Sequence, residues 1–529
     1  MDLAAGLAFV LFVAATCGGP IRNALEMDTD EHYEVTKGLL WAKGYPLYTR
    51  VWNDQPPLYT VLLGVLFKLL GPRAAVARAL AVCFGAILAA GLFHLVRRDN
   101  GILAAIVAAC CLLAAPGVFR LSCAAMLEVP AIGLALCSLW PVRRWEEDAQ
   151  TRWLVLSGLV MAVALQTKLT AGIMAPALAA EIALVAFGRM APRSGGSKVV
   201  FSTNGRFRRL AWPLLVSFGS VSCWFVMLGL LFGSGYRQAW ASHFGLASPE
   251  AKAEISQLAL SPALFLEHPE ALWGLGGAVL VLPCMRSLRR AAFPLVLLAT
   301  AALVHFTHRP YWPYYYLHFS LPIAWLTGCA VAGLSKAAWA RLAPRSGGPM
   351  GGASAQGRTP SRDVRRAKGP WGRGLADWAV LTAATSLISI VGSYGGVRLV
   401  SELEEIQAMP RASDDGLVAA MKKYAGHTRW VYTEETIYAF DAGLCVIPEL
   451  AVMPHKRWWS GQITQDQIVT LLKQYRPQQL LLPAHGVVDG RIAQFAANDY
   501  VVAAEASGCR LFVAAPVFNR EAHPSAPQP

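Results

Sequence analysis

Long uninterrupted runs of apolar residues recur along this chain and constrain its fold more than any other feature. Examples are residues 76–96, 210–232, 317–334 and 376–397. A helix rises about 1.5 Å per residue, so such runs can cross a hydrocarbon core roughly 30 Å thick. Only 15% of the residues are charged, whereas the fraction in soluble globular proteins is about a quarter. The chain is therefore predicted to be an integral membrane protein that is mainly α-helical.

The apolar runs predict a polytopic helical bundle whose orientation follows from its arginines. We expect about eleven spanning helices, at residues 3–19, 76–96, 101–116, 124–141, 153–168, 171–188, 210–233, 270–285, 291–305, 317–335 and 375–395. With a cytoplasmic N-terminus, the dense arginine clusters, such as Arg97-Arg98 and Arg143-Arg144, all fall in inner loops. The positive-inside rule requires this arrangement. The prediction is a multi-pass protein of the inner (plasma) membrane.

This topology places four regions on the outer side of the membrane, namely residues 20–75, 117–123, 234–269 and everything after about 396. The apolar segment 57–70 is too short to span, so we expect a helix lying at the outer interface. The net charge of +14 is concentrated in short inner loops, and it does not indicate a nucleic-acid partner. A hexapeptide repeated at 191–196 and 343–348 is interpreted as part of flexible cytoplasmic insertions.

The chain changes character after about residue 410, which suggests two domains. Residues 1–397 form the predicted membrane domain, and residues 410–529 form a soluble extracytoplasmic domain. Helical spacing at 414–424 and 464–474 alternates with strand-like segments at 429–433 and 479–482, which favours a small α/β domain. We interpret it as a binding or scaffolding module. Its two cysteines, Cys445 and Cys509, could pair outside the cell or remain separate thiols, and the second interpretation is favoured.

An unusual density of acids follows the first predicted helix. Four carboxylates, those of Glu26, Asp28, Asp30 and Glu31, fall within six residues. A solvated acidic surface is the plain alternative, but a carboxylate here could act as a general base or a metal ligand beside the membrane. Two more acids follow at membrane level. They are Asp54, before a proline pair, and Glu128, in an otherwise apolar run.

Cations are predicted at the same membrane face. Lys168 lies between two apolar runs, and His308 and Arg309 precede an aromatic cluster. Each could anchor at lipid headgroups or bind a phosphate. Acids and cations that converge on one face suit a reaction joining a membrane phosphate to a polar group. The competing hypotheses are a transporter or flippase and a non-catalytic membrane scaffold.

These residues resemble the membrane-embedded GT-C glycosyltransferases. The similarity is to the branch of dolichyl-phosphate-mannose protein mannosyltransferases and aminoarabinose–lipid A transferases, in glycosyltransferase family 39. It covers residues 1–335, through an ordered set of short motifs: Asp30-Glu31 with Tyr33, Gly44 to Tyr48, Asp54 to Leu58, Gly71 with Ala77-Arg78, Leu127 to Pro130, Thr167-Lys168 and Tyr316 to Pro322. Gln55 stands where the family has a lysine, and Glu128 where it usually has an aspartate.

The resemblance implies a GT-C fold and transfer of a sugar from a polyprenyl-phosphate carrier. The acceptor would be an envelope lipid, glycan or protein at the outer face. The implied catalytic acids are Asp30 or Asp28, with Glu128. The residues that it implies to bind substrate or lipid phosphate are Lys168, Arg309, His308, Asp54 and Glu31. A single displacement would invert the anomeric carbon. No cofactor is firmly implied and no metal ligands are assigned, although a divalent metal is possible.

Overall fold

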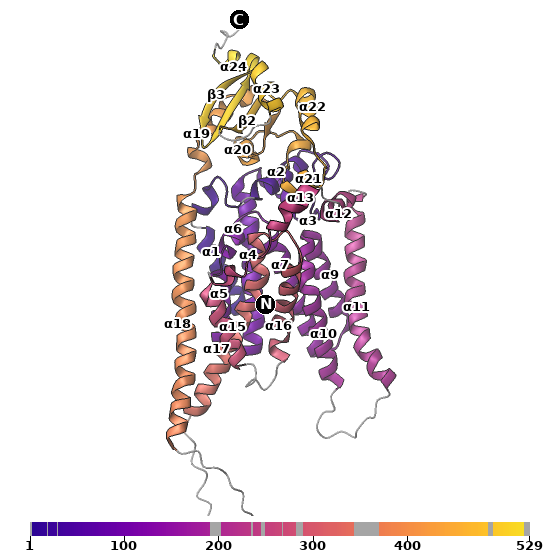
Figure 1. Ribbon diagram of the computed structural model, residues 1–529. Coiled ribbons are helices and arrows are strands. Elements are labelled where there is room, and N and C mark those ends of the chain that lie inside the picture. The colour runs from indigo at the N-terminus through magenta and orange to yellow at the C-terminus, as the bar shows by residue number, and fades with distance from the viewer. Residues whose placement is uncertain are drawn as a thin grey trace, which may run out of the picture.

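The computed structural model describes most of the chain, in ten stretches at residues 3–17, 20–28, 30–190, 203–233, 236–244, 249–266, 268–281, 289–342, 370–484 and 490–522. Both copies of the repeated hexapeptide lie outside the described residues. The molecule has a long helical bundle with a smaller domain at one end (Figure 1).

Every predicted span coincides with one or more helices. They are α1 (Leu3–Cys17), α4 (Ala74–Asn100), α5 (Ile102–Leu113), α7 (Glu128–Cys137), α8 (Leu139–Asp148), α9 (Thr151–Thr167), α10 (Ala175–Met190), α11 (Thr203–Leu230), α15 (Pro269–Val281), α16 (Arg289–Thr307), α17 (Leu317–Leu342) and α18 (Pro370–Ala408). Within the described residues, five helical segments are long and apolar enough to cross a membrane, and other apolar helices are shorter. The chain is a multi-pass membrane protein, while the total of eleven crossings stays a prediction.

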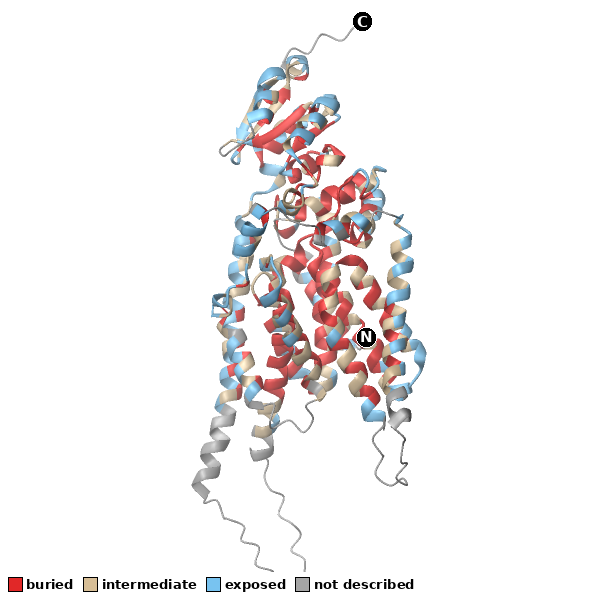
Figure 2. Cartoon of the chain, turned by 45° about the vertical axis from the view of Figure 1, so that its right-hand side comes forward, coloured by how far each residue is buried: buried red, intermediate tan, exposed pale blue. Residues whose placement is uncertain are grey.

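Burial divides the bundle into an inner and an outer set of helices. The apolar window of α17 is 89% buried within the protein, whereas those of α11 and α18 are 17% and 22% buried. Figure 2 shows the same contrast between red inner helices and the paler outer ones. Exposed apolar side chains on the outer helices, such as Leu215 and Val397, suit contact with lipid. The 39 residues of α18 extend about 58 Å, which carries the chain from the far end of the bundle to the terminal domain (Figure 1).

Short helices cover the end of the bundle beneath the terminal domain. They are η1 (Pro20–Asn23), α2 (Glu31–Ala42), α3 (Leu58–Leu70), α6 (Val118–Cys123), η2 (Leu169–Met174), α12 (Tyr236–Phe244), α13 (Pro249–Gln257), α14 (Ala263–Leu266) and η5 (Pro313–Tyr316). The predicted helix at 57–70 is observed as α3. Helix α2 was not predicted. It packs closely on α3, because a Cβ atom at Gly64 would lie 2.3 Å from the Trp41 ring.

The terminal domain contains a four-stranded mixed sheet of order β1-β2-β4-β3. The strands are β1 (Val431–Thr433), β2 (Gln479–Pro483), β3 (Tyr500–Ala506) and β4 (Cys509–Ala514). β1 and β2 are parallel, and the other pairs are antiparallel.

The helices of the terminal domain are α19 (Gly416–Lys423), α20 (Thr436–Asp441), α21 (His455–Trp459), α22 (Gln465–Tyr475), α23 (Gly490–Asp499) and α24 (Ala515–Ala522), with the short η6 (Ala412–Asp414), η7 (Ala425–His427) and η8 (Pro448–Leu450). Strands and helices occur at the four predicted places, whereas the β3–β4 hairpin was not predicted. Cys445 and Cys509 are both free thiols.

The terminal domain shares a hydrophobic core with the helices beneath it. Val35 and Leu39 of α2 belong to the same buried cluster as Ile437 and Phe440 of α20. Hydrogen bonds reinforce this interface, including a 3.0 Å bond between the hydroxyls of Thr36 and Thr436. Because apolar burial is shared in this way, the domain is held firmly over the end of the bundle.

A candidate active site beneath the C-terminal domain

A cavity of about 530 Å³ lies between the end of the bundle and the terminal domain. Its wall is unusually rich in charge. It includes seven carboxylates (Glu26, Asp30, Glu34, Asp54, Glu128, Glu434 and Glu435), three lysines (Lys37, Lys168 and Lys456), two histidines (His32 and His455) and five aromatic residues (Tyr33, Trp312, Tyr314, Tyr315 and Trp458). Buried charges are costly unless paired or hydrogen-bonded, so the pairing within this wall determines what it can bind.

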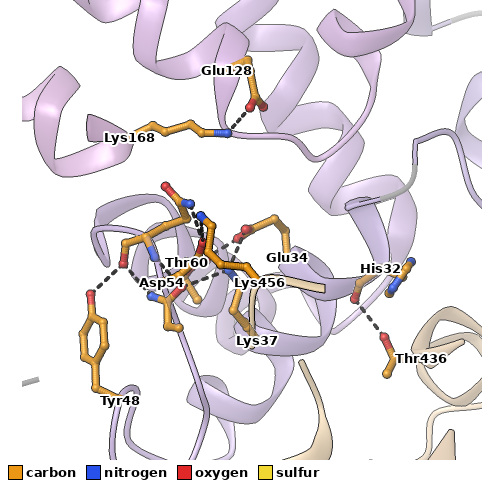
Figure 3. Close-up of polar contacts among 12 residues, drawn as sticks. His32, Glu34, Lys37, Tyr48, Asp54, Thr60, Glu128, Lys168, Thr436 and Lys456 are labelled. Carbon is orange, nitrogen blue, oxygen red and sulfur yellow. Dashed lines mark hydrogen bonds and ion pairs between the residues drawn. The ribbon is translucent and has the colours of Figure 1, made fainter. Parts of the chain in front are cut away.

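One pair joins Lys168 to Glu128, and both side chains are buried. Lys168 follows the last residue of α9 in an extended conformation, and Glu128 is the first residue of α7. The Lys168 ammonium also lies 4.8 Å from the centre of the Tyr314 ring. One oxygen of Glu128, Oε2, has no hydrogen-bond partner among the described residues. Figure 3 shows this pair facing the group around Asp54 across the site.

The other two lysines of the wall are also matched by carboxylates. Lys37 donates to Glu34 over 2.6 Å and to Asn53 over 3.1 Å. All three residues lie in the segments that cover the end of the bundle. Lys456 comes from α21 of the terminal domain and donates to Asp54 over 2.9 Å. Both groups appear in Figure 3. Each lysine of the cavity therefore has one carboxylate partner. We call these three pairs the paired half of the cavity.

The remaining four carboxylates, Glu26, Asp30, Glu434 and Glu435, have no lysine or arginine partner within the described part of the chain. We call them, together with His32, the acidic half of the cavity. His32 Nδ1 lies 2.6 Å from Glu26 Oε1. Burial raises the pKa of Glu26 although His32 opposes the shift, and burial and Glu435 raise the pKa of Glu434. Negative charge is thus less well compensated in this half.

Four of the eight predicted site residues line the cavity, namely Asp30, Asp54, Glu128 and Lys168. The structure does not bring Asp28, Glu31, His308 or Arg309 to its wall. Asp28 lies one turn before α2, where its backbone carbonyl accepts a hydrogen bond from Glu31. His308 and Arg309 are exposed at the end of α16, and Arg309 donates to the carbonyl of Ser256 over 2.6 Å.

Glu31 has a different role from the phosphate contact predicted for it. Arg78 donates to both of its oxygens, over 2.9 and 2.7 Å. The backbone N–H groups of Met27 and Ala125 donate to the same carboxylate. Burial opposes ionisation of Glu31, but Arg78 and these donors lower its pKa. A carboxylate that is fully satisfied by such partners ties α2 to α4 and has no capacity left for a substrate.

Several residues of the wall were missed by sequence reasoning. Lys37 and Glu34 lie in a helix that was not predicted, so their positions one turn apart on one face were not apparent. Lys456 and Glu435 belong to the domain interpreted as a separate module. The only local signals for them are an acidic pair after a strand and a short basic segment, and such signals are common on surfaces.

Chemically, this wall can bind an anion and accept a proton. An ammonium group held by a carboxylate can exchange that partner for a phosphate oxygen, which also accepts charge-assisted hydrogen bonds. A carboxylate without a cationic partner, such as that of Asp30, can act as a general base. The aromatic residues offer faces suited to sugar rings or lipid chains.

Comparisons with known proteins show what the chain and its fold resemble. Residues 54–198 match the family model described as dolichyl-phosphate-mannose-protein mannosyltransferase. The structure is similar to ArnT from Cupriavidus metallidurans bound to undecaprenyl phosphate, with 17% identity, a TM-score of 0.59 and coverage of 98% of this chain and 99% of that one. The apo state of ArnT gives 16% identity, a TM-score of 0.56 and full coverage of both chains. No curated protein sequence matches the chain. The predicted resemblance and the predicted enzyme class, a glycosyltransferase, are confirmed.

Proposed function

We propose that this GT-C glycosyltransferase moves a sugar from a polyprenyl-phosphate carrier to an envelope lipid, glycan or protein, with inversion at the anomeric carbon. The observation that carries the proposal is the position of Asp30, an acid without a basic partner among the described residues, in a cavity that also holds three lysines. Proton acceptance and phosphate binding are thereby available within one enclosed space.

The donor is assigned from the paired half of the cavity. ArnT, which shares the fold, has been crystallised with undecaprenyl phosphate, and a phosphate of this kind suits the Lys168 ammonium. On binding, the phosphate would replace Glu128 as the partner of Lys168. As the bond from the anomeric carbon to the phosphate oxygen breaks, the electron pair stays on that oxygen, where the ammonium stabilises it. We therefore assign Glu128 the role of positioning Lys168.

The acceptor is activated from the acidic half. Asp30 takes the proton of an acceptor hydroxyl as the hydroxyl oxygen attacks the anomeric carbon on the side opposite the phosphate. One bond forms and one breaks in a single displacement, so the configuration inverts. Asp30 is preferred to Asp28 because only Asp30 lines the cavity.

The membrane placement is part of the proposal. A cavity at the outer end of the bundle would lie at the level of the lipid headgroups, where the carrier presents its phosphate. Residues 1–397 would then form the membrane domain and residues 410–529 an extracytoplasmic domain over the site. This interpretation gives the terminal domain a direct role in the site, because it supplies part of the cavity wall.

The experiment compares Asp30→Asn with Asp28→Asn in cells that otherwise lack the protein, with mass spectrometry of envelope glycans as the measurement. The wild type should change one glycoconjugate. Asp28→Asn should retain that change, and Asp30→Asn should reduce transfer by roughly 10²–10⁴-fold. Full transfer by Asp30→Asn would refute the base assignment. A wild type that alters no glycan would instead favour a scaffold.

A further inference from the structure

The three lysines of the cavity differ in how readily they can leave their carboxylates. The Lys37 side chain is 2% exposed and that of Lys168 is 7% exposed, whereas that of Lys456 is 25% exposed. Lys37 also donates to two partners, Glu34 and Asn53. An ion pair that water reaches contributes less to stability than one that is buried. Lys456 is therefore the lysine of the three that can most readily exchange its carboxylate for a substrate.

The carboxylate that holds Lys456 also has a second donor. Gln55 Nε2 lies 2.9 Å from Asp54 Oδ2, and Lys456 Nζ lies 2.9 Å from the same oxygen. The main chain of Gln55 is itself held, since its carbonyl accepts from the Tyr48 hydroxyl and from the Asn53 amide. When Lys456 moves away, Asp54 keeps the hydrogen bond from the Gln55 amide. This remaining bond lowers the cost of the exchange, because the carboxylate is not left unsatisfied.

Helix α21, which carries Lys456, is anchored to both parts of the molecule. The neighbouring Arg457 donates to the carbonyl of Glu449 in its own domain over 2.7 Å. At the end of the helix, the Trp459 ring stacks on that of Trp312 in the bundle, with the ring centres 6.4 Å apart. The backbone of α21 is thus held in place, and the flexible four-carbon stem of Lys456 is the part that can move.

The proposed sugar transfer calls for a second cation at the phosphate. A phosphate that links a carrier to a sugar has one negative charge, and it gains a second as its bond to the sugar breaks. The phosphate monoester that leaves has a charge of about −1.5 to −2 at pH 7, so one ammonium compensates only part of it. Figure 3 shows Lys456 and Asp54 across the site from Lys168 and Glu128. A phosphate in the space between them can be contacted from both sides.

We propose that Lys456 leaves Asp54 when the donor binds and becomes a second binding residue for its phosphate, opposite Lys168. This inference rests on the proposed function. Lys168 belongs to the bundle and Lys456 to the terminal domain, so the phosphate joins the two parts of the molecule. Donor binding and docking of the terminal domain are linked in this way, and each stabilises the other.

The test measures the binding of undecaprenyl phosphate to the full-length protein in detergent. Lys456→Gln should weaken binding by roughly tenfold, because the phosphate loses one charged donor. The swapped variant combines Lys456→Gln with Gln55→Lys, which places an ammonium group at the same Asp54 oxygen. Its affinity should return to within about threefold of the wild type. The matched control combines Lys456→Gln with Gln474→Lys, on an exposed residue of α22 outside the cavity wall, and its affinity should stay low.

Hydrogen exchange separates phosphate binding from docking of the terminal domain. In the wild type, undecaprenyl phosphate should slow exchange in the peptide that contains α21 by at least about threefold, because the phosphate holds Lys456. The swapped variant should bind the carrier without this protection, since its second cation belongs to the bundle. Inorganic phosphate at the same concentration should protect neither protein. Protection by inorganic phosphate would overturn the assignment to the carrier lipid.

Three further results would overturn the inference. The first is equal affinity of Lys456→Gln and the wild type. The second is recovery in the Gln474→Lys control as complete as in the swapped variant, which would indicate a general effect of charge. The third is equal protection of α21 in the swapped variant and the wild type. If the swapped variant does not fold, Lys456→Arg should still bind at least about threefold more tightly than Lys456→Gln, and equal affinities would contradict the inference.

The same measurements distinguish this inference from the proposed function. Lys168→Met should abolish most carrier binding in either case, because Lys168 is assigned to the phosphate independently. Loss of binding in Lys168→Met with full binding in Lys456→Gln would overturn the role of Lys456 and leave the proposed transfer intact. A wild type that binds no undecaprenyl phosphate would contradict both.

Discussion

The two halves of the cavity use the same kind of side chain, the carboxylate, to opposite effect. In the paired half, each of three lysines is bonded to one acid. In the acidic half, the four carboxylates have histidines rather than lysines nearby: His32 pairs with Glu26, and His455 partly offsets the negative charge at Glu434. Because a charge in a partly buried wall is stabilised chiefly by its partner, pairing determines function more than residue type does. The paired half suits an anion that can exchange with a carboxylate, and the acidic half suits a proton or a cation.

Within the paired half, the largest expected effect comes from breaking the pair of Lys168 and Glu128. Lys168→Met should reduce sugar transfer by roughly 10²–10³-fold, because the phosphate loses its ammonium partner. It should also lower the free energy of unfolding by about 3–5 kcal/mol, because the Glu128 carboxylate is left buried and unpaired. Transfer assays and thermal unfolding measure the two effects separately.

A double variant separates stability from function in this pair. Lys168→Met combined with Glu128→Leu removes both charges, so we expect most of the lost stability to return. Transfer should stay low, because no ammonium is restored. Recovery of transfer in the double variant would show that Lys168 acts only through folding.

Asp441, a partly buried acid outside the cavity wall, allows the cost of a carboxylate without a close cationic partner to be measured through the pH dependence of stability. Burial, which outweighs the attraction of Arg78, raises the pKa of Asp441 to about 7, and its Oδ2 atom has no hydrogen-bond partner among the described residues. The folded state therefore holds a proton that the unfolded state, with a pKa of about 3.9, releases. Stability should fall as pH rises from about 4 to 7, and the full cost should persist above pH 7.

Asp441→Asn should remove this cost. We expect an increase on the order of 1–3 kcal/mol in the free energy of unfolding at pH 8 and almost none at pH 4. Thermal unfolding of the purified protein at the two pH values provides the measurement. An equal effect at both values would show that burial does not raise the pKa of Asp441 in the folded state.

The smallest expected effect concerns the lysine that the terminal domain supplies to the paired half. The Lys456 side chain is 25% exposed, so water screens it more than it screens Lys168. Lys456→Met should reduce transfer by roughly tenfold, mainly through a higher KM for the donor. Lys473→Met, an exposed lysine of α22 outside the cavity wall, is the matched control and should behave like the wild type. Equal kinetics for both variants would exclude Lys456 from the site.

Much of the fold could be predicted because its signals are local. Apolar runs marked the helices from α1 to α18, since the length of a run and its lack of charge depend only on neighbouring residues. Helix α22 was visible for the same reason, because helical spacing is also a local signal; the structure adds a capping box of Thr464 and Gln467 at its start. Helix α2 was not predicted, although the acids in its first turn favour a helix.

The candidate site could be predicted only in part. Asp30, Asp54, Glu128 and Lys168 stood out because a charge beside apolar residues is rare and costly. The same reasoning also selected Glu31, whose partner Arg78 is 47 residues away. Local sequence does not show which charge is satisfied by a distant partner, so structural ion pairs and site residues looked alike.

The sequence alone determined that this chain is a helical membrane protein with acids and cations near one predicted face. It could do so because the spacing of neighbouring apolar residues determines which segments are buried. The tertiary structure decided which of those charges meet. Lys456 reaches Asp54 across 402 positions of the chain, and Glu435 approaches His32 only because the terminal domain packs on α2. Electrostatic pairing acts over a few ångströms in space and is independent of separation in sequence. The two halves of the cavity therefore exist only in the folded molecule.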